Sequence, residues 1–313
     1  MLEPKKEFNN IKIHSQYSIC EGAIKIDDLA DYCKKNKIKA TGLADTNNLC
    51  GALEFAEKIS KVGTQPIIGT QINLLFNNII GKITLYATSE KGYKNLTKLS
   101  SLSYLKKKDT YDPSCDIDDL ISNNEDLILL TGNYSDFFGQ LFYANKEKNI
   151  NLLIENLKNA YNNRIYIEIQ RHGENQELNY EKYLLSLSSA YDLPLIASQE
   201  VFYLEPNMAE AHDALICIGE KKFVDDPNRF RYSKAHYIKN DEQIKKLYED
   251  IPEALENNYN FPLRFSFKPK KSKPILPSIS NNQNISAVDE LIKQAKAGLD
   301  LRLKNFIYKK KKL

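Results

Sequence analysis

Short apolar runs alternate along this chain with segments whose apolar residues recur at helical spacing. Ile26, Leu29 and Cys33 form one such helical stripe, and a second follows over residues 53–59. Strands that alternate with helices over short connections predict a parallel sheet with the helices outside it. The pattern leaves open whether this sheet is open or closed into a barrel. Seven apolar runs have the length and composition of strands, namely residues 11–14, 40–44, 66–74, 82–87, 127–131, 164–169 and 194–198.

After Ser198 the pattern becomes mainly helical, with helices predicted over residues 208–218, 241–250 and 252–260. The next stretch is rich in Pro, Lys, Ser and Asn and shows no period, which is typical of a linker. A last helix with one apolar face is predicted over residues 287–303. We therefore expect four parts: a barrel core at 1–205, its mainly helical completion at 206–266, a linker at 267–285 and a connecting segment at 286–313.

Composition excludes several classes of protein. The 313 residues hold 44 Lys and Arg against 41 Asp and Glu, so the net charge of +3 gives no reason to expect a nucleic-acid or membrane partner. No apolar run approaches the roughly 18 residues of a membrane span, and the start, MLEPKKE, has no apolar segment of a secretory signal. The 5 cysteines form no C-x-x-C pair, which fits reduced thiols and speaks against a zinc ribbon. We expect a cytoplasmic protein.

Polar residues stand where the first strands end, and in a βα-repeat protein such positions point into one shared mouth. Their surroundings read HSQYS at 14–18, EG at 21–22, ADTNNLCG at 44–51 and IGTQ at 68–71. These stretches closely resemble the start of the polymerase-and-histidinol-phosphatase (PHP) domain that opens the alpha subunit of bacterial DNA polymerase III. Further matches, such as DPNRFRY at 226–232, extend the resemblance over nearly the whole chain.

The resemblance implies an α/β fold, a distorted seven-stranded (β/α) barrel of the PHP, TIM-like kind, with a helical C-terminal extension. It also implies a site. In intact PHP sites, His, Asp, Glu and Cys ligands hold Zn²⁺ or Mn²⁺, which activates water for phosphoester hydrolysis. Matched position by position, this chain keeps His14, Asp45 and Glu200 as residues able to ligate. The other former metal positions carry changed residues, namely Lys12, Glu21, Thr46, Gln71, Lys82, Asn133 and Phe202.

A catalytic zinc needs three protein ligands for each metal, so three residues spread over a mouth that holds several metals in the family fall short, and two of the positions have become lysine. We therefore expect no metal, no cofactor and no catalytic residue in this chain. Polymerase chemistry needs carboxylates that hold two Mg²⁺ ions, and in the family these lie in the palm, beyond the segment that this sequence matches. The chain alone is not expected to polymerise DNA, and Mg²⁺ and DNA would be bound by downstream domains of a full-length polymerase.

Three functions remain open. The first is a catalytically silent scaffold and docking domain of a replicative polymerase, with other DNA polymerase III holoenzyme subunits as partners and the proofreading exonuclease subunit as one candidate. The second is an active metal-dependent phosphoesterase or 3′–5′ exonuclease. The third is a free-standing nucleic-acid-binding module, for which the basic and aromatic run at 229–234 is the feature to examine. Bound metal would favour the second, and salt-dependent DNA binding the third.

Individual charged residues in the mouth carry further predictions. An unpaired buried carboxylate is costly, so we expect Lys12 to form an ion pair with Asp45 or Glu200. His172 follows a strand in a turn and is predicted to be a surface residue, whereas His212 lies on a helix and is predicted to be structural.

Overall fold

Residues 6–106, 112–274 and 286–310 are described by a computed structural model. The chain divides into a first unit, Met1–Lys270, and a second, Lys271–Leu313. The first unit holds every strand of the described residues and the whole of the predicted site. The boundaries predicted for the four parts remain a proposal, and residues 275–285 of the predicted linker lie outside the described residues.

All seven predicted strands form, and the last continues after Gln199 as a short eighth strand. The hydrogen-bonded order is β7-β6-β5-β4-β3-β2-β1-β8. Because only Gln199 separates β7 from β8, the chain itself joins the two edges of the sheet, and the strands make a nearly closed barrel. The strands are β1 (Lys12–Ile13), β2 (Ala40–Thr46), β3 (Gln65–Phe76), β4 (Ile79–Ala87), β5 (Leu127–Leu130), β6 (Ile165–Gln170), β7 (Leu195–Ser198) and β8 (Glu200–Val201).

The expectation of a wholly parallel sheet is wrong at β4, which runs antiparallel to both β3 and β5. No helix separates β3 from β4, and the connection consists of Asn77 and Asn78. Both residues have positive φ, 48° and 64°, which is the backbone geometry of a tight two-residue hairpin turn and one that Asn tolerates. The strand therefore turns back on its neighbour.

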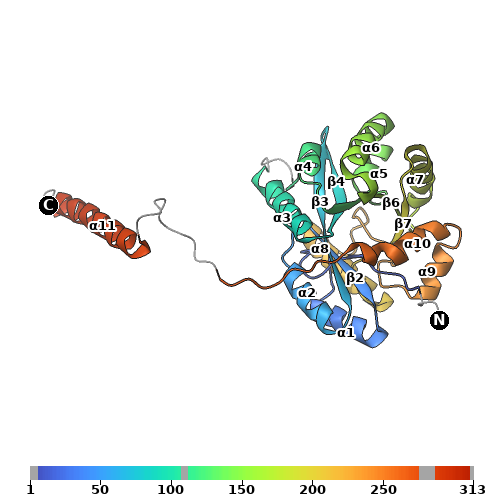
Figure 1. The fold of residues 1–313 in the computed structure, drawn as a ribbon, viewed down its shortest axis with the longest axis horizontal. Helices are drawn as coiled ribbons and strands as arrows, with labels where there is room; N and C mark the ends of the chain where they lie inside the picture. Colours follow the sequence, from blue (N-terminus) through green and yellow to red (C-terminus); the bar gives the residue numbers. More distant parts are fainter. Residues whose placement is uncertain (1–5, 107–111, 275–285, 311–313) are drawn as a thin grey trace. The chain divides into compact units, whose positions relative to one another are not determined.

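Helices surround the strands of the first unit (Figure 1). The helices predicted from apolar periodicity all form, and the stripe of Ile26, Leu29 and Cys33 is buried against the sheet. The first unit contains α1 (Ile26–Asn36), α2 (Ala52–Lys61), α3 (Glu90–Leu105), α4 (Ile117–Ser122), α5 (Phe137–Tyr143), α6 (Glu147–Tyr161), α7 (Glu177–Tyr191), α8 (Ala209–Glu220), α9 (Asp241–Leu247) and α10 (Pro252–Asn260).

The barrel interior changes from apolar to charged along the strands. Tyr166, Glu168 and Gln170 alternate on β6 and so share one face, because strand side chains repeat every two residues. Tyr166 belongs to an apolar cluster that includes Phe261 and Phe265, which follow α10. Glu168 and Gln170, nearer the strand end, are buried among polar groups instead. This polar end of the barrel is the mouth.

The second unit contains α11 (Ala287–Lys310). The apolar face predicted for this helix is exposed at Val288, Leu291 and Leu299. Among the described residues of either unit, no helix is both long and apolar enough to cross a membrane.

Candidate functional site at the barrel mouth

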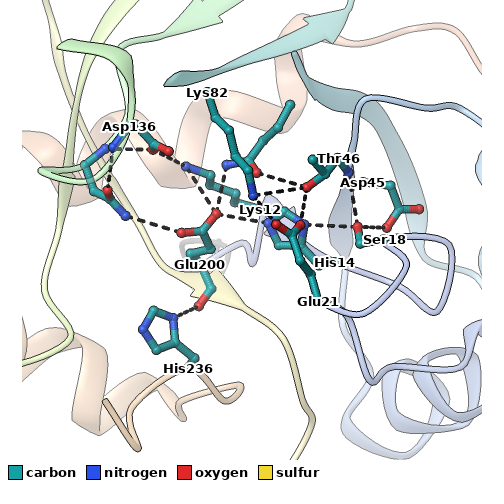
Figure 2. A network of polar contacts seen from close by, with 12 residues as sticks. Lys12, His14, Ser18, Glu21, Asp45, Thr46, Lys82, Asp136, Glu200 and His236 are labelled. Carbon is teal, nitrogen blue, oxygen red and sulfur yellow. Dashed lines mark hydrogen bonds and ion pairs between the residues drawn. The ribbon is translucent and has the colours of Figure 1, made fainter. Parts of the chain in front are cut away.

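The predicted site residues converge on the mouth from separate elements, and most belong to one connected network (Figure 2). Lys12 lies on β1, and His14 directly follows this strand. The parallel strands place their last side chains at the same end of the barrel, and the antiparallel β4 contributes Lys82 from its first half, so neighbours in space come from distant parts of the sequence. The remaining positions are Glu21, Asp45, Thr46, Gln71, Lys82, Asn133, Glu200 and Phe202.

Lys12 lies at the centre of three carboxylates. Its ammonium Nζ is 3.1 Å from Asp136 Oδ2, 3.6 Å from Glu168 Oε2 and 3.7 Å from Glu200 Oε1. The lysine is 0% exposed. Lys12 and Glu200 are direct partners in the parallel pairing of β1 with β8, which explains how they meet. The prediction that Lys12 pairs with Asp45 or Glu200 is confirmed for Glu200.

The three carboxylates around Lys12 set the protonation of this centre. Burial alone would lower the pKa of Lys12, but Asp136, Glu168 and Glu200 together outweigh burial and raise it well above its usual value. For Asp136, burial and the neighbouring Glu200 and Glu168 outweigh the attraction of Lys12 and raise the pKa to about 6. Since three buried carboxylates share one ammonium, the pKa of Asp136 is raised even though Asp136 is the nearest partner of Lys12.

Glu200 connects several of the predicted positions. Its Oε1 accepts a hydrogen bond from Gln71 Nε2 at 2.8 Å and lies 3.0 Å from His14 Nε2, and its Oε2 accepts from Asn133 Nδ2 at 3.3 Å. Burial would raise the pKa of Glu200, but Lys12 and the hydrogen bond from His14 hold it well below its ordinary value. Glu200 is therefore an ionised carboxylate with a full set of partners.

Asp45 is satisfied differently. Its oxygens accept three hydrogen bonds of 2.7 Å each, from the backbone N–H and hydroxyl of Ser15 and the hydroxyl of Ser18. Burial outweighs these bonds and raises the pKa of Asp45. Ser18 Oγ also lies 3.2 Å from His14 Nδ1, so a chain of contacts links Asp45 through Ser18 and His14 to Glu200 (Figure 2).

A second lysine lies at the rim of the mouth. Lys82 donates a 2.5 Å hydrogen bond to Glu21 Oε1, and the hydroxyl of Thr46 donates to the other oxygen of Glu21. The side chains of Lys82 and Glu21 are 23% and 25% exposed, so this pair is more open to solvent than the Lys12 centre. Burial would raise the pKa of Glu21, but Lys82 and the other partners lower it.

Aromatic rings pack beside the charged network. Phe202 is buried, and its ring centroid lies 4.7 Å from that of His14 and 5.2 Å from that of His212. His212 is buried and its Nε2 lies 2.8 Å from the carbonyl oxygen of Glu21, as predicted for a structural residue.

The prediction that His172 lies at the surface is wrong. The residue is 4% exposed, and its ring stacks on His236 with 4.0 Å between centroids. Its Nε2 accepts a hydrogen bond from the backbone N–H of Glu200, and burial lowers its pKa to about 3. The segment that carries His236 covers the turn, which no local signal around His172 indicates.

Two of the three carboxylates around Lys12, those of Asp136 and Glu168, were missed by the analysis of the sequence. Glu168 could have been found from its place in the middle of the apolar strand IYIEIQ. A strand of this composition is buried on both faces of its sheet, and a charged side chain buried there needs a partner. Asp136 gives no comparable signal: it precedes α5 in a polar loop, and only the barrel brings it to Lys12.

The residues of the mouth do not fit a metal ion. Metal ligands surround a cation with free lone pairs, but here Lys12 Nζ already lies between the three nearest carboxylates. His14 is engaged with Glu200 and Ser18. Among the described residues, no group of three or more His, Cys, Asp and Glu side chains is arranged to hold a metal. The arrangement can hold fixed charges in place, and it offers no site for a metal-bound water.

The strands form an α/β barrel with a charged mouth, which is the architecture that the resemblance implied and that the apolar pattern alone had left open. The PHP domain family matches residues 10–172, which is more than half of the chain, so the chain belongs to the PHP domain family.

Longer relatives cover the rest of the sequence. The chain is 35% identical over 306 residues to the DNA polymerase III subunit alpha of Caulobacter vibrioides and 34% identical over 300 residues to that of Rickettsia felis. These matches cover 95% and 96% of this chain but 27% and 25% of the relatives, so the chain spans about a quarter of their length. It corresponds to the N-terminal PHP part of such subunits.

A solved structure of a putative metal-dependent phosphoesterase from Bifidobacterium adolescentis also resembles this chain. The likeness covers 79% of this chain and 97% of that protein, with 11% identity and a TM-score of 0.47. A similarity of this degree says nothing about activity.

Proposed function

We propose that this chain is a catalytically silent PHP domain that serves as a scaffold and docking domain of a DNA polymerase III alpha subunit. The observation that carries the proposal is the ammonium of Lys12, which lies among the carboxylates of Asp136, Glu168 and Glu200, where it would stand in for a metal cation. A covalently attached cation cannot activate water as a metal does, but it offsets part of the repulsion among the three carboxylates.

The similarity to DNA polymerase III alpha subunits supports a role in DNA replication. As the PHP part of an alpha subunit, the chain would act in DNA replication in the cytoplasm, beside other subunits of the polymerase III holoenzyme. The proofreading exonuclease subunit is one candidate partner. The DNA-directed DNA polymerase (nucleotidyltransferase) activity and its Mg²⁺ would belong to parts of the subunit other than this domain, because the match spans about a quarter of the relatives.

Hydrolysis assays test the proposal directly. The purified chain is incubated with a 5′-labelled single-stranded oligonucleotide and with p-nitrophenyl phosphate, each with added Mn²⁺ or Zn²⁺. We expect no cleavage above a no-protein control. We also expect no extension of a primed template with dNTPs and Mg²⁺.

The His14→Ala variant is the matched control, because it removes a ligand that a metal site would need and leaves Lys12 in place. Metal-stimulated hydrolysis that this variant abolishes would show an active phosphoesterase or exonuclease and would overturn the scaffold proposal. Metal analysis of the purified chain gives an independent reading, since a tightly bound metal at near-stoichiometric amounts contradicts the assignment of Lys12 as the cation.

A further inference from the structure

The three carboxylates around Lys12, those of Asp136, Glu168 and Glu200, form a cage whose size suits an ammonium group. The distances from Lys12 Nζ to their nearest oxygens are 3.1, 3.6 and 3.7 Å. In Figure 2 the ammonium and the oxygens of Asp136 and Glu200 point toward one another. A metal ion bound to all three carboxylates needs oxygens at about 2.0–2.6 Å, so the cage would have to contract by roughly 1 Å.

Each carboxylate of this cage is also held by a donor other than Lys12. Asp136 Oδ2 accepts a backbone N–H of its own loop at 2.9 Å. Glu168 Oε1 accepts a hydrogen bond from a hydroxyl on β7, and Glu200 Oε1 accepts one from a side-chain amide on β3 at 2.8 Å. Contraction around a metal ion would stretch or break these bonds. The cage is therefore held open at the width of an ammonium contact.

One oxygen of the cage has no hydrogen bond. Glu168 is 0% exposed, and among the described residues its Oε2 has no hydrogen-bond partner, although it lies 3.6 Å from Lys12 Nζ. The lysine donates to Asp136 instead. An ammonium carries three N–H groups, one for each carboxylate of the cage. Since β1 fixes where the Lys12 side chain starts, an ammonium without this tether can move closer to Glu168.

We propose that the carboxylate cage is a binding site for a primary alkylammonium group and not for a divalent metal ion. In this chain the ammonium of Lys12 occupies the cage. When the Lys12 side chain is truncated, the cage takes up a free alkylammonium ion from solution. This inference rests on the proposed scaffold function, in which Lys12 stands in for a metal cation, and it goes further by naming the kind of cation that the cage selects.

Rescue of a truncated variant tests the proposal. Lys12→Ala removes three carbon atoms and the ammonium, which together have the size of n-propylammonium. Because the cage is buried, the variant is refolded from urea with the cation present, and its thermal unfolding midpoint is measured. We expect propylammonium at about 100 mM to raise this midpoint by at least about 3 °C, since a ligand of the folded state stabilises it by mass action. Propanol, which lacks the charge, and tetramethylammonium, which lacks N–H groups, should not raise it.

Three control proteins separate binding in the cage from a general effect of salt. The parent and Lys12→Met have the same space filled by a side chain, so propylammonium should shift their midpoints no more than NaCl does at the same concentration. Lys82→Ala removes the other lysine of the mouth, whose pair with Glu21 is partly exposed, and it should also show no specific shift. If Lys12→Ala does not fold by itself, recovery of the folded state with propylammonium is the same test.

Two results would overturn the proposal. Stabilisation of Lys12→Ala by Mn²⁺ or Zn²⁺ beyond that by propylammonium would show that Lys12 covers a metal site. Equal shifts with propylammonium and NaCl, or a variant that refolds with none of these cations, would show that the cage does not recognise an ammonium. Absence of rescue beside absent hydrolysis by the parent rejects this inference alone, whereas metal-dependent hydrolysis by the parent rejects the scaffold function.

Discussion

Glu200 and Asp45 are two buried carboxylates of the same barrel mouth, and the fold stabilises them by opposite means. Glu200 is 5% exposed and lies 3.7 Å from the Lys12 ammonium. Asp45 is 1% exposed and accepts hydrogen bonds from Ser15 and Ser18 without a cation in contact. The pKa of Glu200 falls well below its ordinary value, and the pKa of Asp45 rises.

The difference shows what a cation does in a buried site that hydroxyls do not. Burial penalises the ionised form of both residues, and a nearby positive charge can more than offset that penalty. Three hydrogen bonds at Asp45 offset only part of it. Because Ser18 and His14 connect the two carboxylates, the mouth is one network in which a lysine contacts the carboxylate at one end and uncharged donors contact the carboxylate at the other.

The largest effect is expected at the end where Lys12 lies. Lys12→Met should lower the free energy of unfolding by about 3–5 kcal/mol, because it leaves Asp136, Glu168 and Glu200 buried without their cation. Urea denaturation of the parent and the variant measures this loss.

A second substitution checks the cause of that loss. Lys12→Met combined with Asp136→Asn should be more stable than Lys12→Met alone, since one stranded charge is removed. Asp45→Asn should give no such rescue, because Asp45 does not contact Lys12. A loss of under about 0.5 kcal/mol in Lys12→Met would match an ordinary surface change and would contradict the role of the lysine as an internal cation.

The two carboxylates should show opposite dependence on pH. The folded pKa of Glu200 is depressed, so its contribution to stability is lost as pH falls below its ordinary value of 4.5. The folded pKa of Asp45 is raised, so its contribution declines as pH rises above its ordinary value of 3.8. Each pKa unit of difference corresponds to about 1.4 kcal/mol.

Denaturant titrations at several pH values measure this contrast. The parent should exceed Glu200→Gln in free energy of unfolding by an amount that increases from about pH 3 to pH 4.5. The corresponding difference between the parent and Asp45→Asn should decrease above about pH 4. If both stability differences changed with pH in the same direction, the contact with Lys12 would not be what sets Glu200 apart from Asp45.

The smallest effect is expected at the rim. Lys82→Met breaks the ion pair with Glu21, but both side chains retain contact with solvent, so the loss should be within about 1 kcal/mol. The loss should also shrink in high salt, which screens an exposed pair more than a buried one. Thermal unfolding at low and high salt provides the measurement. If Lys82→Met lost as much stability as Lys12→Met, burial would not explain the difference expected between the two lysines.

Much of this mouth could be predicted from the sequence through its resemblance to the PHP domain. Lys12 stands two residues from His14 on one face of a strand, and this spacing together with the leftover carboxylates predicted the pair with Glu200. Its nearest partner, Asp136, lies 124 positions further along the chain, and Glu168 lies on another strand again. No local pattern relates these residues, because their distance depends on how the barrel closes.

The sequence by itself determined where the strands and helices form, because apolar periodicity acts over a few neighbouring positions. Its resemblance to the PHP domain, and not periodicity, led to the prediction that two lysines stand at former ligand positions. Only the tertiary structure decided that β4 runs antiparallel, that His172 is buried and that Lys12 contacts three carboxylates rather than one. Each of these depends on which distant segments pack together, and buried electrostatic energies are set by those distances and by the exclusion of water.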